Sequence, residues 1–159
     1  MTHAALGMTD FDRLLLDTAF EQACKSLSEG GIPIGSALGD PESGEIVAAA
    51  HNLRVQEGDT TAHAETACIR AAGRRRDWHR LTLASTLSPC VMCTGTALLF
   101  RIPRIVIGEN KNFVGAEGLL ASEGASLIHA HDERCAEMMR IWITENADLW
   151  NEDIGVPES

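Results

Sequence analysis

Two cysteines and one histidine have the types and the spacing of a metal site. Cys90 and Cys93 are three positions apart in Ser88-Pro89-Cys90-Val91-Met92-Cys93, and His63 lies upstream of them. Two thiolates and one imidazole suit Zn²⁺, which binds sulfur and nitrogen ligands in a tetrahedron. Three protein ligands leave the fourth position open, which is typical of a catalytic zinc and not of a structural one. The sequence therefore predicts one catalytic Zn²⁺ per chain.

Glu65 is the acid and base that this zinc chemistry would need. It follows His63 by two positions and is not required as a ligand, so its carboxylate is free to move protons to and from a zinc-bound water. On a regular helix, residues two positions apart point about 200° away from each other. We therefore expect His63 and Glu65 at the beginning of a helix, where their side chains can lie on either side of a bound metal.

Two other functions fit the cysteine pair less well. A redox pair would leave the neighbouring His63 and Glu65 without a role. A structural zinc would need a fourth protein ligand, and the remaining cysteines lie on apolar helical stripes, where we expect them in the core. These remaining cysteines are Cys24, Cys68 and Cys135.

The elements that must position these residues alternate along the chain. Apolar residues at helical spacing predict helices over 9–29, 62–73, 90–100, 119–123 and from 133 onward. Apolar and β-branched segments predict strands over 32–38, 45–50, 81–86, 103–108 and 125–130, with a turn over 39–44. Strands separated by helices after an initial hairpin predict an α/β fold, with a mixed sheet covered by helices on both faces.

Cys90 and His63 each stand at the beginning of a predicted helix. Unpaired backbone N–H groups and the positive end of the helix dipole lie there, and both lower the pKa of a cysteine and favour the thiolate. Two helix N-termini at the ends of neighbouring strands form a crevice, which is where α/β proteins bind their ligands. The predicted fold and the predicted metal site thus agree.

Composition limits the partners and the location. The net charge of −10 argues against a nucleic-acid partner, which needs clustered Lys and Arg. No apolar run approaches the ~20 residues of a membrane span, and no secretory signal opens the chain. An odd number of cysteines, five, is typical of reduced thiols, so we expect a cytoplasmic protein. A chain of 159 residues is expected to form one domain over 1–159.

The two halves of the metal motif resemble those of a known enzyme superfamily. His63-Ala64-Glu65 followed by Pro89-Cys90-Val91-Met92-Cys93 is similar to the His-x-Glu and Pro-Cys-x-x-Cys signature of zinc-dependent cytidine and deoxycytidylate deaminases. From Asp10 to Gly155 the chain resembles fungal-type cytosine deaminases most closely. The matching segments include Gly31-Ile32-Pro33-Ile34-Gly35, His51-Asn52, Gly108-Glu109-Asn110, Asp132-Glu133-Arg134-Cys135 and Glu152-Asp153-Ile154-Gly155.

The resemblance implies a three-layer α/β/α sandwich with a five-stranded sheet, a homodimer, and a set of residues that bind the substrate. Asn52 would hydrogen-bond a base oxygen, and Asp153 would contact a ring N–H or the amino group. Phe113 and Trp150 would wall the pocket and stack on the base, while Ser88 would place its backbone carbonyl near the leaving amine. The implied substrate-binding residues are Ile34, Asn52, Ser88, Phe113, Trp150 and Asp153.

The activity expected from the resemblance is the hydrolytic deamination of a free aminopyrimidine base, with release of ammonia. The substrate would be cytosine or a related amino-heterocycle such as isocytosine or an aminotriazine. Val55 stands where the fungal enzymes have an aromatic residue, which predicts a roomier pocket. Guanine deaminase and tRNA adenosine deaminase are the alternatives. The segment 150–155 favours a pyrimidine substrate, and the acidic net charge disfavours RNA.

Overall fold

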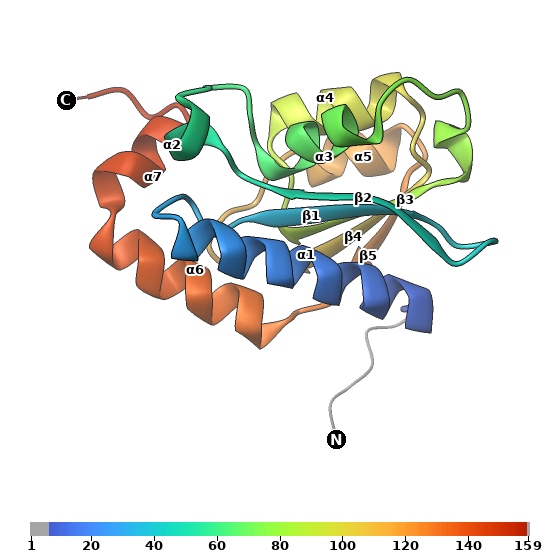
Figure 1. Cartoon of the computed structure of the whole chain (residues 1–159), viewed down its shortest axis with the longest axis horizontal. Coiled ribbons are helices and arrows are strands. Elements are labelled where there is room, and N and C mark those ends of the chain that lie inside the picture. The colour runs from blue at the N-terminus through green and yellow to red at the C-terminus, as the bar shows by residue number, and fades with distance from the viewer. Residues whose placement is uncertain (1–6, 159) are drawn as a thin grey trace.

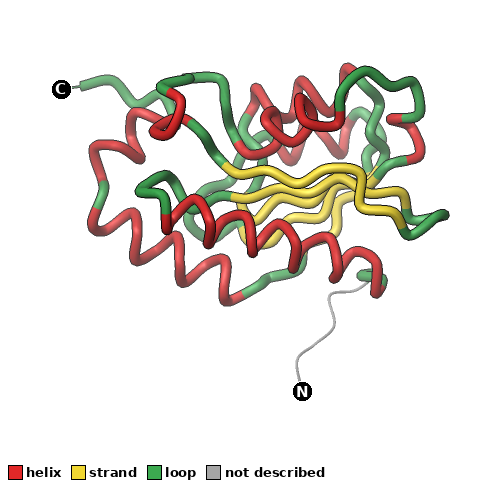
Figure 2. Tube along the Cα trace, in the orientation of Figure 1, coloured by secondary structure: helices red, strands yellow, loops and turns green. Residues whose placement is uncertain are grey.

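Five strands form one mixed sheet in the computed structural model, which describes residues 7–158 (Figure 2). They are β1 (Gly35–Asp40), β2 (Glu45–His51), β3 (Thr82–Leu87), β4 (Arg104–Glu109) and β5 (Ser126–His129), in the order β2-β1-β3-β4-β5. β1 runs antiparallel to β2 and to β3, and the pairs β3–β4 and β4–β5 are parallel. The carboxyl ends of β2, β3 and β4 therefore meet at one end of the sheet.

Helices cover both faces of this sheet, so the predicted three-layer α/β/α sandwich is confirmed (Figure 1). One face carries α1 (Asp10–Ser28) and α6 (Glu133–Glu145), and the other carries α3 (Ala64–Ala72), α4 (Val91–Leu99) and α5 (Glu117–Ser122). The short helices α2 (Arg54–Glu57) and α7 (Ala147–Asp153) lie together beyond the end of the sheet. A 3₁₀ turn, Trp78–Arg80, precedes β3.

The longest helix, α1, packs unusually close to the sheet. Leu15, Leu16 and Ala19 are fully buried in the apolar layer between α1 and the strands. A Cβ atom at Gly35, the first residue of β1, would lie 1.9 Å from the carbonyl oxygen of Ala19, so only glycine fits there. Within residues 7–158, no helix is both long enough and apolar enough to cross a membrane.

Several predicted boundaries were wrong. β1 begins at Gly35 and not at Ile32, because Pro33 lacks the N–H that a ladder needs. At its other end β1 continues through Asp40, which we expected in a turn, with a register shift between Leu38 and Gly39. Neither α2 nor α7 was predicted, because helices of four and seven residues leave almost no periodic pattern in a sequence.

Cys24 is a further correction, since it is exposed although we expected it in the core with Cys68 and Cys135. It follows the fully buried Ala23, and consecutive helical residues point about 100° apart. Cys24 thus lies at the flank of the apolar stripe of α1. The other two are buried as predicted.

Candidate active site

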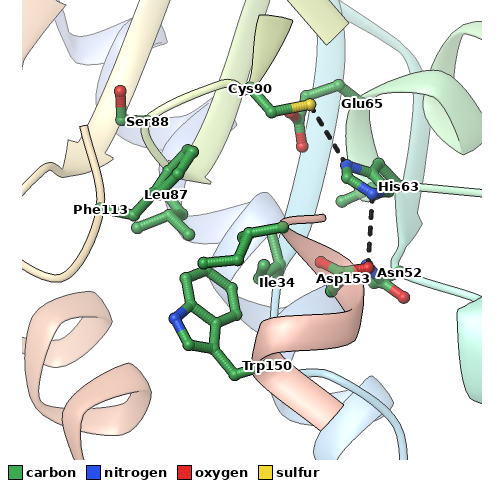
Figure 3. A pocket seen from close by; sticks show the side chains of 12 residues that line it. Ile34, Asn52, His63, Glu65, Leu87, Ser88, Cys90, Phe113, Trp150 and Asp153 are labelled. Carbon is green, nitrogen blue, oxygen red and sulfur yellow. Dashed lines mark hydrogen bonds and ion pairs between the residues drawn. The ribbon is translucent and has the colours of Figure 1, made fainter. Parts of the chain in front are cut away.

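His63, Cys90 and Cys93 come together at the end of the sheet where β2 and β3 finish. His63 is the N-cap residue of α3, Cys90 is the N-cap residue of α4, and Cys93 lies in the first turn of α4. Their ligand atoms all lie within 4.8 Å of one another, and His63 Nδ1 is 3.4 Å from Cys90 Sγ (Figure 3). Two sulfurs and one nitrogen at this spacing fit Zn²⁺, so these residues can hold the predicted metal.

Glu65 lies beside these ligands and is almost completely buried. Because His63 is the N-cap residue and has extended backbone angles (φ −67°, ψ 161°), its side chain does not follow the helical periodicity of α3. The expectation that His63 and Glu65 flank one site from the beginning of a helix is therefore met, and both line the same cavity. Burial raises the pKa of the Glu65 carboxyl, although a hydrogen bond with Cys93 opposes that shift.

The thiols and the imidazole are strongly coupled. Hydrogen bonds from Cys93 and from the His63 ring lower the pKa of Cys90 to about 4. The Cys90 thiolate and burial together raise the pKa of the Cys93 thiol. Burial opposes a charge on His63, but its hydrogen bonds with Asp153 and Cys90 outweigh burial and raise its pKa to about 10. The Cys90 thiolate and the Asp153 carboxylate thus lie on either side of the His63 ring, and anionic groups of this kind favour a bound divalent cation.

A cavity with about 310 Å³ of empty space, including open solvent at its mouth, lies next to the metal ligands. All six residues that we predicted to bind substrate line it. Ala64, Leu87 and Ile154 also line it and were not predicted, because apolar residues carry no chemical signal; each is adjacent in sequence to a predicted one. The complete lining is Ile34, Asn52, His63, Ala64, Glu65, Leu87, Ser88, Cys90, Phe113, Trp150, Asp153 and Ile154.

Asp153 and Asn52 are the buried polar groups at one side of the cavity. Asp153 Oδ1 is 3.3 Å from His63 Nε2 and accepts a hydrogen bond of 3.5 Å from Asn52 Nδ2. It also accepts one of 2.7 Å from Arg54 Nε. Burial opposes ionisation of Asp153, but the bonds from His63 and Arg54 outweigh it and lower its pKa. A carboxylate is therefore available to accept an N–H from a bound molecule.

Ser88 turns its hydroxyl away from the cavity (Figure 3). The hydroxyl donates to Glu117 and accepts a hydrogen bond of 2.9 Å from the backbone N–H of Gly115. A Cβ atom at Gly115 would lie 1.8 Å from the carbonyl oxygen of Pro89, so only glycine lets this loop approach the metal-binding segment. The Ser88 hydroxyl is therefore engaged away from the cavity, and the role of the Ser88 carbonyl stays a prediction.

Aromatic rings form the apolar wall of the cavity. Phe113 and Trp150 meet edge to face with ring centroids 5.9 Å apart, and Trp150 in turn meets Trp142 of α6 at 6.4 Å. Ile34 and Leu87 belong to the same buried cluster as Trp150. A mostly apolar cavity with a few buried polar groups suits a small heterocycle.

Val55 does not belong to this wall. It lies on α2 with 43% of its surface exposed and is not among the residues that line the cavity. The preceding residue, Arg54, turns inward instead, and consecutive residues of a helix point in different directions. Val55 itself does not reach the cavity, and the effect of an aromatic residue at this position stays a prediction.

Comparison with known proteins identifies the family to which this fold and this site belong. The family model of the cytidine and deoxycytidylate deaminase zinc-binding region matches residues 9–109. The chain is 41% identical over 150 residues to a cytosine deaminase of Candida albicans, covering 93% of this chain and 99% of that relative. It is 37% identical over 118 residues to a tRNA-specific adenosine deaminase of Haemophilus influenzae, covering 72% of this chain and 68% of that relative.

The fold has solved counterparts as well. A guanine deaminase from Nitrosomonas europaea is similar with a TM-score of 0.69 and 19% identity, over 90% of each chain. The family match, the curated relatives and the site geometry define a zinc-dependent hydrolase that acts on carbon–nitrogen bonds. The chain belongs to the cytidine and deoxycytidylate deaminase family, as its two motifs predicted.

Proposed function

We propose that this enzyme hydrolyses the exocyclic amino group of a free aminopyrimidine base, cytosine or a closely related amino-heterocycle. The observation that carries the proposal is the position of Glu65. A buried carboxyl lies beside three residues that can bind zinc and lines the cavity next to them. This arrangement serves the addition of water to an amidine carbon, where one group must take a proton and return it.

Different residues of the chain would bind the metal and transfer the protons in this reaction. His63, Cys90 and Cys93 would hold Zn²⁺, which supplies a Lewis acid that makes water a competent nucleophile near neutral pH. Glu65 accepts a proton as water adds to the amino-bearing carbon, and it passes that proton to the ring nitrogen. It then delivers the second water proton to the amine as the C–N bond breaks. The products are ammonia and the oxo base.

The burial of Glu65 supports this double role. Because burial raises its pKa, its affinity for a proton lies closer to that of the groups with which it exchanges protons. Such a positioned acid and base contributes roughly 10²–10⁴-fold to the rate.

The walls of the cavity favour a planar base. Phe113 and Trp150 would stack against or border its faces, while Asp153 would accept a hydrogen bond from a ring N–H and Asn52 would donate one to the carbonyl oxygen of the base. Similarity to a cytosine deaminase over 99% of that relative's length favours a free base over a nucleoside. Ser88 would accept a hydrogen bond from the departing amine through its backbone carbonyl, and Ile34 would pack against the base.

Cytosine is the leading candidate among the bases. The cytosine deaminase of Candida albicans aligns over 99% of its own length, whereas the tRNA-specific adenosine deaminase of Haemophilus influenzae aligns over 68%. A net charge of −10 is also poorly suited to holding an RNA loop. Deamination of a free pyrimidine base would serve pyrimidine salvage, and the reduced thiols that the site requires fit the cytoplasm.

A homodimer is part of this proposal. Apolar side chains lie exposed on the outer helix α4 and just after it, and this exposure favours a second copy of the chain as their partner. They are Val91 (70% exposed), Leu99 (73%) and Phe100 (36%).

Removal and return of the metal test the proposed chemistry. Protein stripped with a chelator should release no ammonia from cytosine, and added Zn²⁺ should restore the release together with one equivalent of uracil. Cytidine serves as the control and should turn over at least about ten times more slowly, which corresponds to about 1.4 kcal/mol. Turnover by the stripped protein, or equal turnover of cytidine, would contradict the proposal.

A further inference from the structure

Arg54 reaches the active site from outside the predicted motif. It is the first residue of α2, and its side chain is only 13% exposed. Its guanidinium donates to Asp153 Oδ1 through Nε (2.7 Å), to Glu152 Oε2 through Nη1 (3.3 Å) and to the Thr60 carbonyl through Nη2 (3.3 Å). One side chain thus joins the segment after β2 to α7, which lies 99 positions further along the chain.

The shortest of these contacts ends on a pocket residue. The Asp153 side chain is 2% exposed, and its ion pairs among residues 7–158 are with Arg54 and His63. Within the described part of the chain, Arg54 is the one arginine or lysine that pairs with this carboxylate. A buried carboxylate without such a partner is strongly destabilised. Arg54 therefore pairs with the buried carboxylate and holds Oδ1 near His63 Nε2.

The backbone of Arg54 orients a second pocket residue. Its N–H donates to Asn52 Oδ1 over 2.9 Å, so the Asn52 amide is fixed with Nδ2 toward Asp153. The three residues form a chain of contacts in which Arg54 binds both polar groups of the cavity wall and is not itself among the residues that line that cavity.

The same contact secures α7. A seven-residue helix is not stable by itself, so the position of α7 depends on contacts with the rest of the molecule. Trp150 packs against Phe113 and Trp142 on one side of α7, and Arg54 holds Glu152 and Asp153 at its carboxyl end. Trp150 and Asp153 both line the cavity, so its shape depends on where α7 lies.

We propose that Arg54 is a positioning residue, which through Asp153 keeps the polar wall of the cavity and the C-terminal helix α7 in place for substrate binding. The inference rests on the proposed function, because it concerns the same site. Arg54 acts through Asp153 and does not itself touch the base.

The test compares Arg54→Gln with the full-length zinc-loaded wild type. We expect kcat/KM for cytosine to fall about 10²-fold, the usual effect of displacing a substrate-binding group by about 1 Å, mostly through a higher KM. Deuterium uptake of the peptide over 146–155 should rise at least about ten-fold, while uptake over 82–87 stays unchanged. Zinc content, measured in parallel, should equal that of the wild type.

Three further variants sharpen the comparison. Arg54→Lys keeps the charge, but its single ammonium nitrogen cannot reach Asp153, Glu152 and Thr60 together, so it should recover only part of the loss. Glu152→Gln removes only the outer, solvent-exposed contact of Arg54 and should stay within about two-fold of the wild type. Arg70→Gln removes an exposed arginine that pairs with Glu57 of α2 and should behave as the wild type.

The two readouts together decide the outcome. A fall in kcat/KM without faster deuterium uptake over 146–155 would overturn the proposal, and so would faster uptake without that fall. A Glu152→Gln variant with the same losses as Arg54→Gln would also overturn it. If the wild type deaminates no base, the proposed function fails, and unchanged exchange in Arg54→Gln would separately show that Arg54 does not hold α7.

Discussion

At the scale of single residues, the site separates binding of the metal from movement of protons. His63, Cys90 and Cys93 hold ligand atoms within 4.8 Å of one another, while Glu65 lies beside them in the first turn of the helix that His63 caps and stays free. The separation depends on His63 being a helix cap. One turn deeper in α3, a histidine and a glutamate two positions apart would face different sides of the helix.

Replacement of the Glu65 carboxylate by an amide tests this division. Glu65→Gln keeps the shape and part of the hydrogen bonding but cannot accept a proton, so kcat should fall roughly 10²–10⁴-fold. The protein should stay folded and zinc-loaded, because Glu65 is not a ligand and its neutral replacement is easier to bury. Metal analysis and ammonia release measure the two effects. A Glu65→Gln variant that keeps more than about one tenth of the wild-type kcat would remove Glu65 from the mechanism.

The sequence revealed the residues that act through chemistry more readily than those that act through shape. His63, Glu65, Cys90 and Cys93 stand out because their types and spacing are specific to one kind of chemistry. Leu87 and Ile154 line the cavity without any such mark. Arg54 was not predicted because its contact with Asp153 joins positions that only the folded chain brings together.

At the scale of elements, hydrogen bonds between segments far apart in the sequence hold the helices against the sheet. Asp12 in the first turn of α1 accepts hydrogen bonds from the Thr9 backbone and from the guanidinium of Arg104, the first residue of β4. Burial opposes the Asp12 charge, but the bonds from Arg104 and Thr9 outweigh it and lower its pKa below 3.8. Asp12 therefore takes part in the N-terminal cap of α1 and also fixes this helix to the sheet.

Asp12→Asn should lower the free energy of unfolding by about 3 kcal/mol at pH 7, since it leaves the Arg104 charge without its buried partner. The folded-state pKa of Asp12 lies below its unfolded value, so its stabilisation is fully present above about pH 4 and is lost as the pH falls through the folded-state pKa. The difference in the free energy of unfolding between the wild type and Asp12→Asn should thus be constant from about pH 7 to 5 and shrink below about pH 4. Urea unfolding at several pH values measures it, and a difference that grows on acidification would contradict the assignment.

The long, patterned elements were predictable and the short ones were not. The five strands and the helices on both faces follow from hydrophobic periodicity and the hairpin signal, and Cys90 and His63 do begin helices. The helix α7 was missed because packing of Trp150 and the contact with Arg54 determine its position, and neither leaves a local pattern. The single domain over 1–159 stays a prediction.

At the scale of the whole molecule, the net charge disfavours one kind of partner and the exposed apolar surface favours another. The net charge of −10 opposes RNA, while Leu99 and Val91 are largely exposed on one outer helix. Leu99→Asp should therefore convert a dimer of the 17.1 kDa chain into a monomer in sedimentation velocity experiments. Leu14→Asp, at an exposed apolar position of α1 on the opposite face of the sheet, is the matched control and should remain dimeric. A wild-type monomer would contradict the proposed assembly.

The most direct test of the proposed function is ammonia release by the zinc-loaded protein across a panel of bases. The panel comprises cytosine, 5-substituted cytosines, isocytosine, aminotriazines, guanine and cytidine, compared by kcat/KM. The proposed function predicts that cytosine or a close free-base analogue is deaminated with the highest kcat/KM, and that guanine and cytidine lag by at least about ten-fold, or about 1.4 kcal/mol. Guanine as the best substrate, or no release from any free base, would contradict it.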